Sequence, residues 1–447
     1  MSELVMKYRQ YEEYKESGVE WLDVIPSHWV MSKIKYISPF QVGWTPPTGN
    51  DSNFIGENIW ANISDLRGKV ITDTVKRISD KAAKEASMDI TPKGSLLYSF
   101  KLSVGSVSFA GCDMYTNEAI ASFTSDSLLP LKYLYYVLPK FLIENASTNI
   151  YGARILNQEL IRNAIILKPT YEEAETIANF LDHETAQIDT LIEKQQTLIQ
   201  LLKEKRQAVI SHAVTKGLNP DAPMKDSGVE WLGEVPEHWK VKGIKRLSEI
   251  KRGASPRPIA DQKYFDDEGE YAWTRIADVS RAGMYLDTTA QRLSDLGASL
   301  SVKLEAGELF LSIAGTVGKP CITISKACIH DGFVYFPTLK INNKFLFYIF
   351  EAGQAYLGLG KMGTQLNLNT ETVGGIEIGL PPEEEIEAII NYIEHEKARF
   401  DHLIDKAQQQ IQIMQERRTA LISAAVTGKI DVRGWVAPES KTTLESL

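Results

Sequence analysis

The stretch KESGVEWLDVIPSHW at residues 15–29 recurs without a gap as KDSGVEWLGEVPEHW at residues 225–239. Over 21 positions counted from the start of each copy, 12 are identical, which excludes chance. The register persists along the chain at offsets of 210 to 213, where WANISD (60–65) matches WTRIAD (273–278) and GSLLYS (94–99) matches GELFLS (307–312). Similarity at a fixed period is the signature of a repeated architecture, so the chain is a tandem duplication.

Each half contains one region with the texture of strands and loops. In residues 30–170 and 240–382, short apolar runs alternate with Gly, Pro, Asn and Asp, as in strands joined by turns. One helix is expected inside each region, at 131–138 after Pro130 and at 345–355. We therefore predict an α+β fold with two mixed α/β domains.

Each half ends in a region of a different texture, which predicts a long helix over 171–216 and over 383–429. Residues 172–214 contain neither Gly nor Pro, and apolar residues recur there at steps of three and four, the pattern of a coiled coil. The predicted seam residues are Ile177, Leu181, Ile188, Leu191, Leu198, Leu202 and Val209, and then Ile389, Ile393, Phe400, Leu403, Ala407, Met414 and Leu421.

Two such helices in one chain, with a folded domain between them, can pair only as an antiparallel coiled coil. Each would be roughly 65 Å long at 1.5 Å per residue. The repeat is then expected to be pseudo-two-fold. The predicted segments are an N-terminal segment and linker (1–29), the first domain (30–170), the first helix (171–216), a linker (217–239), the second domain (240–382), the second helix (383–429) and a C-terminal tail (430–447).

The composition is that of a globular chain of 447 residues, with 43% apolar and 24% charged residues. We expect no membrane association and a cytoplasmic location, because no run of about 18 apolar residues and no secretory signal pattern appears. The three cysteines, Cys112, Cys321 and Cys328, have no C-x-x-C spacing and are read as plain buried thiols of a reducing compartment.

The formal charge of −9 is unevenly distributed. Residues 30–168 hold 15 Lys and Arg against 12 Asp and Glu, and residues 240–380 hold 17 against 15, so the two domains carry +3 and +2. The helix regions are each −3, from 5 against 8 and from 6 against 9. Nucleic acid is therefore expected to meet the globular domains, and protein partners the helices.

Motifs of catalysis are not found. Gly315-Thr-Val-Gly318-Lys319 is too short for a phosphate-binding loop and is read as a tight strand connection. His183-Glu184 and His395-Glu396 lack the second histidine of a zinc-protease helix. No metal-ligand spacing, nucleophile elbow or adenine-gripping Pro-Pro-aromatic motif appears, so neither a catalytic site, a cofactor site nor a metal site is predicted.

Several features together resemble one family. Each domain opens with Gly-x-x-Pro (Gly43-Trp44-Thr45-Pro46 and Gly253-Ala254-Ser255-Pro256), continues with Trp-x-x-Ile-x-Asp, and has a Gly-rich strand before Val104-Gly105 or Val317-Gly318. Each then ends at Pro169 or Pro381-Pro382 before a long helix. In this order, repeated twice over nearly the whole chain, the features resemble the specificity subunit of type I restriction-modification enzymes.

The resemblance implies a targeting subunit without catalysis of its own. Each target-recognition domain would read one half of a bipartite, asymmetric site in double-stranded DNA, and the helices would set the spacer. Two modification subunits, carrying S-adenosylmethionine and methylating adenine, would dock against the helices. Restriction subunits would add ATP- and Mg-dependent translocation and cleavage, in a system of defence against foreign DNA.

Candidate DNA contacts are the loop residues of the types that read base edges or hold phosphates. In the first domain they are Trp44, Thr45, Lys101, Ser103, Asn117, Tyr151 and Arg154. In the second they are Arg252, Ser255, Arg257, Arg275, Thr316, Lys319, His330, Lys361 and Gln365. An exposed polar residue without function is about as common at any one position.

The twinned tryptophans Trp21, Trp29, Trp231 and Trp239 are interpreted as anchors that join each linker to its domain, since buried aromatic residues usually pack. His28 and His238 are expected to be hydrogen-bonded and at least partly buried. Two other functions remain open: a methyltransferase or nuclease with its own recognition domains, and a structural coiled-coil scaffold with carbohydrate- or protein-binding domains. Binding of S-adenosylmethionine by the isolated chain would test the first, and salt-dependent duplex binding the second.

Overall fold

The computed structural model describes residues 8–87, 89–101, 104–148, 154–356, 359, 361–362, 365–366 and 368–438. It divides into two compact units, unit 1 (residues 1–195 and 409–447) and unit 2 (residues 196–408). Each unit holds one globular domain, the beginning of one long helix and the end of the other. Within the described residues, no helix is both long and apolar enough to span a bilayer.

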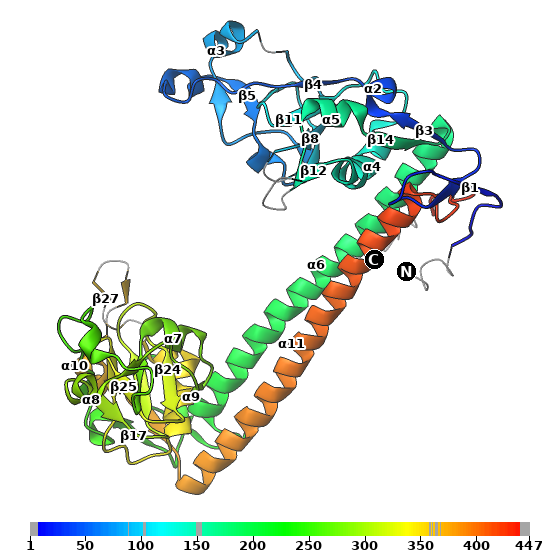
Figure 1. Ribbon diagram of the computed structural model, residues 1–447. Coiled ribbons are helices and arrows are strands. Elements are labelled where there is room, and N and C mark those ends of the chain that lie inside the picture. The colour runs from blue at the N-terminus through cyan, green and yellow to red at the C-terminus, as the bar shows by residue number, and fades with distance from the viewer. Residues whose placement is uncertain are drawn as a thin grey trace. The chain divides into compact units, whose positions relative to one another are not determined.

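The first domain is built on a five-stranded and a three-stranded sheet (Figure 1). The larger sheet has the order β4(Phe40–Val42), β11(Ile120–Phe123), β8(Leu96–Ser99), β9(Val107–Ala110), β6(Val70–Ile71), and the smaller has the order β10(Tyr115–Thr116), β5(Asn58–Ala61), β7(Arg77–Ile78). All side chains of β8 and β11 are buried, which explains why neither strand alternates apolar residues with charged ones. The strand pairs are β1(Tyr14–Glu16) with β2(Val24–Pro26), β3(Val30–Lys33) with β14(Ile165–Lys168), and β12(Ser147–Thr148) with β13(Arg154–Ile155).

The second domain repeats this topology. Its five-stranded sheet has the order β18(Lys251–Arg252), β26(Phe333–Tyr335), β23(Leu309–Ser312), β24(Pro320–Thr323), β20(Tyr285–Leu286). The other sheet has the order β21(Arg292–Leu293), β19(Tyr271–Thr274), β25(Ala327–Ile329), β22(Val302–Leu304). The pairs are β15(Met224–Asp226) with β16(Glu234–Pro236), β17(Lys240–Gly243) with β29(Glu377–Leu380), and β27(Lys361–Met362) with β28(Gln365–Leu366). Strand pairs that are parallel in one domain, such as β6 with β9, are parallel in the other. The duplication inferred from sequence therefore extends to the sheet topology.

Short helices complete each domain. In the first they are α2(Ile34–Ile37), α3(Asp80–Glu85), α4(Leu131–Glu144), α5(Gln158–Asn163) and the 3-10 turns η1(Asp51–Phe54) and η2(Ile63–Asp65). In the second they are α7(Ile276–Arg281), α8(Asp295–Ser299), α9(Asn343–Ala352), α10(Thr370–Gly375), η3(Ile244–Arg246), η4(Gln262–Tyr264) and η5(Gln354–Tyr356). The two expected internal helices are α4 and α9, and both bury their apolar residues in the main core of their unit. The segment 315–319 is, as expected, a tight connection, between β23 and β24.

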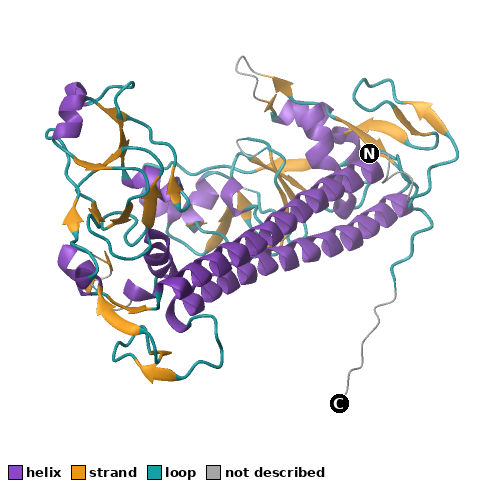
Figure 2. Cartoon of the chain, turned by 90° about the horizontal axis from the view of Figure 1, so that it is seen from below, coloured by secondary structure: helices purple, strands orange, loops and turns teal. Residues whose placement is uncertain are grey.

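The long helices are α6(Tyr171–Lys216) and α11(Glu383–Val426). In each unit a segment of one lies beside a segment of the other (Figures 1 and 2), and the colours of Figure 1 show that the two segments run in opposite chain directions. The antiparallel coiled coil is therefore confirmed. In unit 1 the beginning of α6 shares its core with the end of α11, including Leu181 and Leu421, and in unit 2 the end of α6 shares its core with the beginning of α11, including Ile210 and Ile389.

Most of the predicted seam is buried or half-buried. These residues are Ile177, Leu181, Ile188, Leu202 and Val209 in α6, and Ile389, Ile393, Phe400, Ala407, Met414 and Leu421 in α11. From Phe400 onward they follow each other at steps of seven residues, and from Ile188 onward at steps of fourteen and then seven, with Gln195 at the intervening position. One of the two seam positions in each heptad was thus predicted correctly.

The other position was wrong by one residue. Leu191, Leu198 and Leu403 are 51%, 43% and 39% exposed, and the next residue in each case, Ile192, Ile199 or Ile404, is turned inward. From Leu181 onward the spacing between successive inward-facing residues is four and then three, as in Leu181, Thr185 and Ile188. The predicted spacing from Ile188 onward was three and then four. Both phases offer an apolar residue at each of these sites, so hydropathy alone does not distinguish them.

Two equivalent ion pairs cross between the helices. In unit 1, Arg418 Nε and Nη2 lie 2.8 and 3.2 Å from the two carboxylate oxygens of Asp189. In unit 2, Arg206 donates to Asp401. The two arginines and the two aspartates are each 212 residues apart in sequence, and each arginine is half-buried on the seam side of its helix. The pairs therefore fix the same register in both units.

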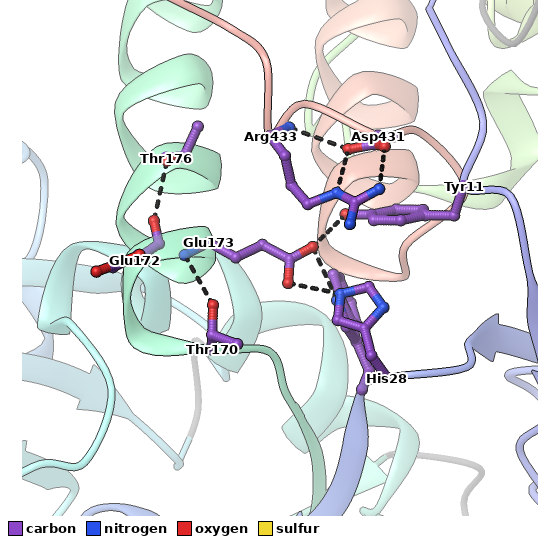
Figure 3. Close-up of polar contacts among 9 residues, drawn as sticks. Tyr11, His28, Thr170, Glu172, Glu173, Thr176, Asp431 and Arg433 are labelled. Atoms are coloured by element: carbon purple, nitrogen blue, oxygen red, sulfur yellow. Dashed lines mark hydrogen bonds and ion pairs between the residues drawn. The ribbon is translucent and has the colours of Figure 1, made fainter.

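The linker tryptophans join each domain to the start of its long helix. Trp29 Nε1 and His28 Nε2 lie 3.0 and 2.8 Å from the carboxylate of Glu173, in the first turn of α6 (Figure 3). Trp239 Nε1 and His238 Nε2 contact Glu385 in α11 at 3.1 and 2.7 Å. Both tryptophans are fully buried, which confirms their reading as anchors. Trp21 packs edge-on against Phe141, and Trp231 against the core of unit 2.

Candidate nucleic-acid interface

In the second domain, two loops meet at a glycine. A Cβ atom on Gly253 would lie 2.2 Å from the carbonyl oxygen of His330, so only glycine allows this approach. The contact brings the loop after β18 against the loop between β25 and β26. It thereby gathers four of the candidate residues, Arg252, Ser255, Arg257 and His330, around Asp331.

Asp331 holds this group together. Ser255 Oγ donates to its Oδ1 at 2.7 Å, and Arg257 Nη2 lies 3.0 Å from its Oδ2. Arg252 Nε donates to its backbone carbonyl. The hydrogen bond from Ser255 lowers the pKa of Asp331, Arg257 acts in the same direction, and burial opposes them. The carboxylate is therefore charged wherever the protein would bind DNA.

His330 is turned toward the interior of the same loops. Its ring lies 4.7 Å from that of Phe333 and 6.1 Å from that of Trp273, and its Nδ1 accepts from the backbone of Gly332 at 2.7 Å. Burial lowers the pKa of His330, and the charges of Arg252 and Arg275 add to this while Asp331 opposes it. The neutral, half-buried ring therefore stabilises the conformation of the loop, in addition to any contact that it makes with a ligand.

A second group of candidates lies around α7 and the loop between β23 and β24. Lys319 Nζ donates to the carbonyl of Ser280 at 2.9 Å, and Thr316 Oγ1 lies 2.9 Å from Ser280 Oγ. The fully buried carboxylate of Asp278 caps α7 by accepting from the backbone of Arg275 at 3.0 Å, and it pairs with Arg281 at 2.9 Å. Arg275 Nε is buried 3.7 Å from Asp278 Oδ2 and has no hydrogen-bond partner among the described residues.

The first domain has the same loop contact. A Cβ on Gly43 would lie 1.8 Å from the carbonyl oxygen of Thr116, and Thr45 Oγ1 donates to Glu118. Thr45 and Ser255 are 210 residues apart, and Glu118 and Asp331 are 213 apart, the offsets of the repeat. A hydroxyl bonded to a carboxylate therefore occupies equivalent positions in both domains.

The remaining candidates are more scattered. Asn117 Oδ1 accepts from the backbone of Ala119 at 3.1 Å, and the carbonyl of Trp44 accepts from Trp60 Nε1 at 3.0 Å. Arg154 Nη1 donates to the carbonyl of Ile143 at 2.6 Å. Lys101 is exposed, with its ammonium 5.9 Å from the Phe100 ring centre. Ser103 and Tyr151 lie outside the described residues, as do the side chains of Lys361 and Gln365 on β27 and β28.

Sequence reasoning missed the carboxylates. The candidate residues were cations, amides and hydroxyls, because these are the usual partners of bases and phosphates. Glu118 and Asp331 could have been found from the repeat itself, since a hydroxyl residue and an acidic residue recur together in both halves. Within the described residues no cluster of histidine, cysteine and carboxylate side chains suited to a metal ion is found.

The arrangement can bind a polar, anionic ligand by direct contact. Arg252 and Arg257 are exposed at the loops of the second domain, where guanidinium donors remain after the contacts to Asp331. Such donors suit the acceptors of guanine and the oxygens of phosphates.

Comparison with known proteins also finds two copies of one domain in this chain. A family model described as the type I restriction modification DNA specificity domain matches twice, over residues 26–201 and 236–415. The MjaVIII specificity subunit of Methanocaldococcus jannaschii is 23% identical over 449 residues, 96% of this chain and 99% of that protein. The MjaIX specificity subunit of the same organism is 26% identical over 262 residues, 56% of this chain and 58% of that protein.

Two solved structures share the fold. A chain from a study of complex assembly and conformational transition in the type I R-M system has a TM-score of 0.71 at 14% identity, covering 91% of this chain and 99% of that chain. The HsdS subunit of Thermoanaerobacter tengcongensis has a TM-score of 0.54, also at 14% identity, covering 91% of this chain and 98% of that chain.

Proposed function

This chain belongs to the type I restriction-modification DNA specificity family, and we propose that each of its two domains reads one half of a bipartite DNA site. The observation that carries the proposal is the equivalent loop contact at Gly43 and Gly253, which presents a group of polar side chains at the same place in both domains. The groups differ in composition, because Arg252 and Arg257 correspond to Val42 and Pro47. The two half-sites should therefore differ in sequence, so the whole site is asymmetric.

The chain acts as a targeting subunit and leaves catalysis to its partners. Modification subunits would supply S-adenosylmethionine and methylate adenine, and restriction subunits would use ATP and Mg, all in the cytoplasm. This chain would need no cofactor. Two features support this role. Each domain has loops that present polar side chains, and each domain carries a charge of +2 to +3, which suits DNA although the whole chain is acidic.

The helices offer a surface to the modification subunits. Leu201 on α6 and Ile413 on α11 are 56% and 55% exposed, and they are equivalent in the repeat at an offset of 212. Leu201 belongs to unit 2 and Ile413 to unit 1, so each unit carries one. Exposed apolar residues that recur in this way suit two copies of the same partner.

The docking surface is tested by substitution. Leu201→Glu and Ile413→Glu should each reduce the number of modification subunits that copurify from two to one, and together to none. Gln410→Glu, at an exposed polar position of α11, is the matched control and should leave assembly intact. Normal assembly of the double variant would place the docking surface elsewhere.

The function is tested by sequencing methylated bases in cells that express this chain with its modification subunits. A bipartite adenine-methylated motif should appear with the chain and vanish without it. Adding one helical turn to both long helices should change the spacer and leave both half-sites as they are. A methylation pattern independent of the chain would contradict the targeting role and favour a scaffold.

A further inference from the structure

Asp331 differs from an ordinary surface carboxylate in what it holds. It accepts from Ser255 and pairs with Arg257 through different oxygens, and its backbone carbonyl accepts from Arg252. Arg252 is the last residue of β18, and Ser255 and Arg257 lie in the loop that follows it. The start of this loop is also held by backbone hydrogen bonds from Gly253 N to Phe333 O at 2.9 Å and from Ala254 N to Ile329 O at 3.1 Å. One aspartate thus ties the loop that carries the cations to the loop after β25.

Stability alone gives this arrangement little reason to exist. The Arg257 side chain is 74% exposed and that of Asp331 is 41% exposed, and ion pairs at such positions add little to folding. Such an ion pair has a larger effect on the conformation of the arginine side chain than on the stability of the fold. A free guanidinium on a flexible stem samples many rotamers, whereas one held by a carboxylate has its plane and direction set before a ligand arrives.

The charge of Asp331 also affects selectivity. A carboxylate next to two arginines lowers the positive potential at the loop, which weakens contacts to any phosphate regardless of sequence. It does not remove the remaining guanidinium donors, since Arg257 uses one terminal nitrogen for the pair. The combination weakens sequence-independent binding and favours directed contacts to base edges.

We propose that Asp331 is a positioning residue for the second half-site, which fixes Ser255 and Arg257 for readout of base edges and keeps sequence-independent binding weak. The inference rests on the proposed function. Glu118 holds the equivalent place in the first domain, but its described contact is to Thr45 alone, so its role there is confined to the hydroxyl.

The experiment uses the full chain assembled with its modification subunits and compares wild type with Asp331→Asn. The amide keeps an acceptor for Ser255 but cannot pair with Arg257. Methylation at sites with one changed base in the second half should rise relative to the intact site by about tenfold, the scale of one lost bidentate contact, while the first half-site stays as selective as before. Binding to DNA without the site should tighten and become more dependent on salt.

Three further variants make the result decisive. Asp267→Asn removes the same charge at an exposed position in the turn between η4 and β19 and should change neither half-site. Asp331→Glu retains the carboxylate and should recover part of the selectivity. Glu118→Gln should alter only the first half-site.

The outcomes separate the inference from the function. If wild type gives a chain-dependent motif and Asp331→Asn reads the second half-site as strictly as wild type, the inference is overturned alone. It is likewise overturned if Asp331→Asn weakens both half-sites equally, or if Asp267→Asn gives the same change. If wild type gives no chain-dependent motif, the proposed function fails, and the inference with it.

Discussion

At both junctions between linker and long helix a His and a Trp contact a Glu of the helix, but the two junctions differ in the number of side chains on that Glu and in its burial. At Glu173 three side chains converge, because Tyr11 donates at 2.8 Å in addition to His28 and Trp29, and the carboxylate side chain is 4% exposed. Among the described residues Glu385 accepts from the side chains of His238 and Trp239 alone, and it is 26% exposed. Unit 1 has the more buried junction.

The reason lies in the path of the chain. In unit 2 the end of α6, the linker and the second domain follow each other without interruption. In unit 1 the end of α11 and the segment before the first domain are separate pieces, joined by the hydrogen bond from Asp431 N to Arg9 O at 2.7 Å. Arg433 pairs with Asp431 at 2.7 Å and lies over the Tyr11 ring at 5.0 Å (Figure 3). A backbone hydrogen bond and side-chain contacts thus replace a covalent linker.

Glu173→Ala should give the largest effect. It leaves the buried Tyr11 hydroxyl and Trp29 Nε1 without an acceptor, each at a cost of about 1–3 kcal/mol, so unit 1 should lose about 3 kcal/mol or more. Glu385→Ala should cost about 1–2 kcal/mol in unit 2, because its site is more open to water. Hydrogen exchange of residues 8–29 and 217–239 separates the two units, and Glu172→Ala controls for the charge at the helix start. Equal losses at both junctions would contradict the comparison.

Tyr11→Phe isolates the contact that unit 1 has in addition. The loss should be about 1 kcal/mol, the usual contribution of one hydrogen bond. In a Glu173→Ala background the same change should instead recover stability, because it removes a buried hydroxyl that has already lost its acceptor. Chemical denaturation measures both values, with Tyr171→Phe, at an exposed tyrosine, as the control. If Tyr11→Phe costs the same with and without Glu173, the two residues are not coupled.

The helix ion pairs should have smaller effects that are alike in the two units. Arg418→Ala and Arg206→Ala should each cost up to about 1 kcal/mol, as expected for partly exposed pairs. Exchanging the charges, with Arg418→Asp and Asp189→Arg together, should recover part of the loss measured for either change alone. A much larger cost for one arginine would show that the register is held in one unit only.

The smallest expected difference between the two domains is in how their stability depends on pH in mild acid. Burial lowers the pKa of His330 in the folded protein, so the unfolded chain binds the proton more readily. The stability that His330 contributes is therefore present above about pH 6.5 and is lost as the pH falls below it. Its equivalent in the first domain, Asn117, does not titrate. Thermal unfolding from pH 7.5 to 5.5 should show a shallower decline for His330→Asn than for wild type, and parallel curves would argue against this source.

The sequence was sufficient to predict the structure wherever the two halves of the chain could be compared with each other. The repeat predicted both domains and the long helices, and the paired Trp29 and Trp239 indicated anchors. It was not sufficient where two readings satisfy the same pattern, as at Leu191 and Ile192, since the phase of a seam depends on the partner helix. The carboxylates Glu173 and Asp331 were also missed, because their partners are 144 and 76 residues away along the chain. A single sequence gives no direct sign of contacts at such separations. Only the recurrence of the same residue types in both halves, Asp331 with Glu118 and Glu173 with Glu385, could have pointed to them.

The division of the chain also has a consequence in time. Unit 2 is one continuous stretch, residues 196–408, so all of its parts have been synthesised once that stretch has left the ribosome. Unit 1 also needs residues 409–435, so its first 195 residues wait for the rest of the chain. At roughly 5–20 residues per second the 240 residues between them take roughly 10–50 s. During that interval the Tyr11 ring lacks Arg433 and the apolar start of α6 lacks its partners from the end of α11, so the part of the protein made first is the last to be completed.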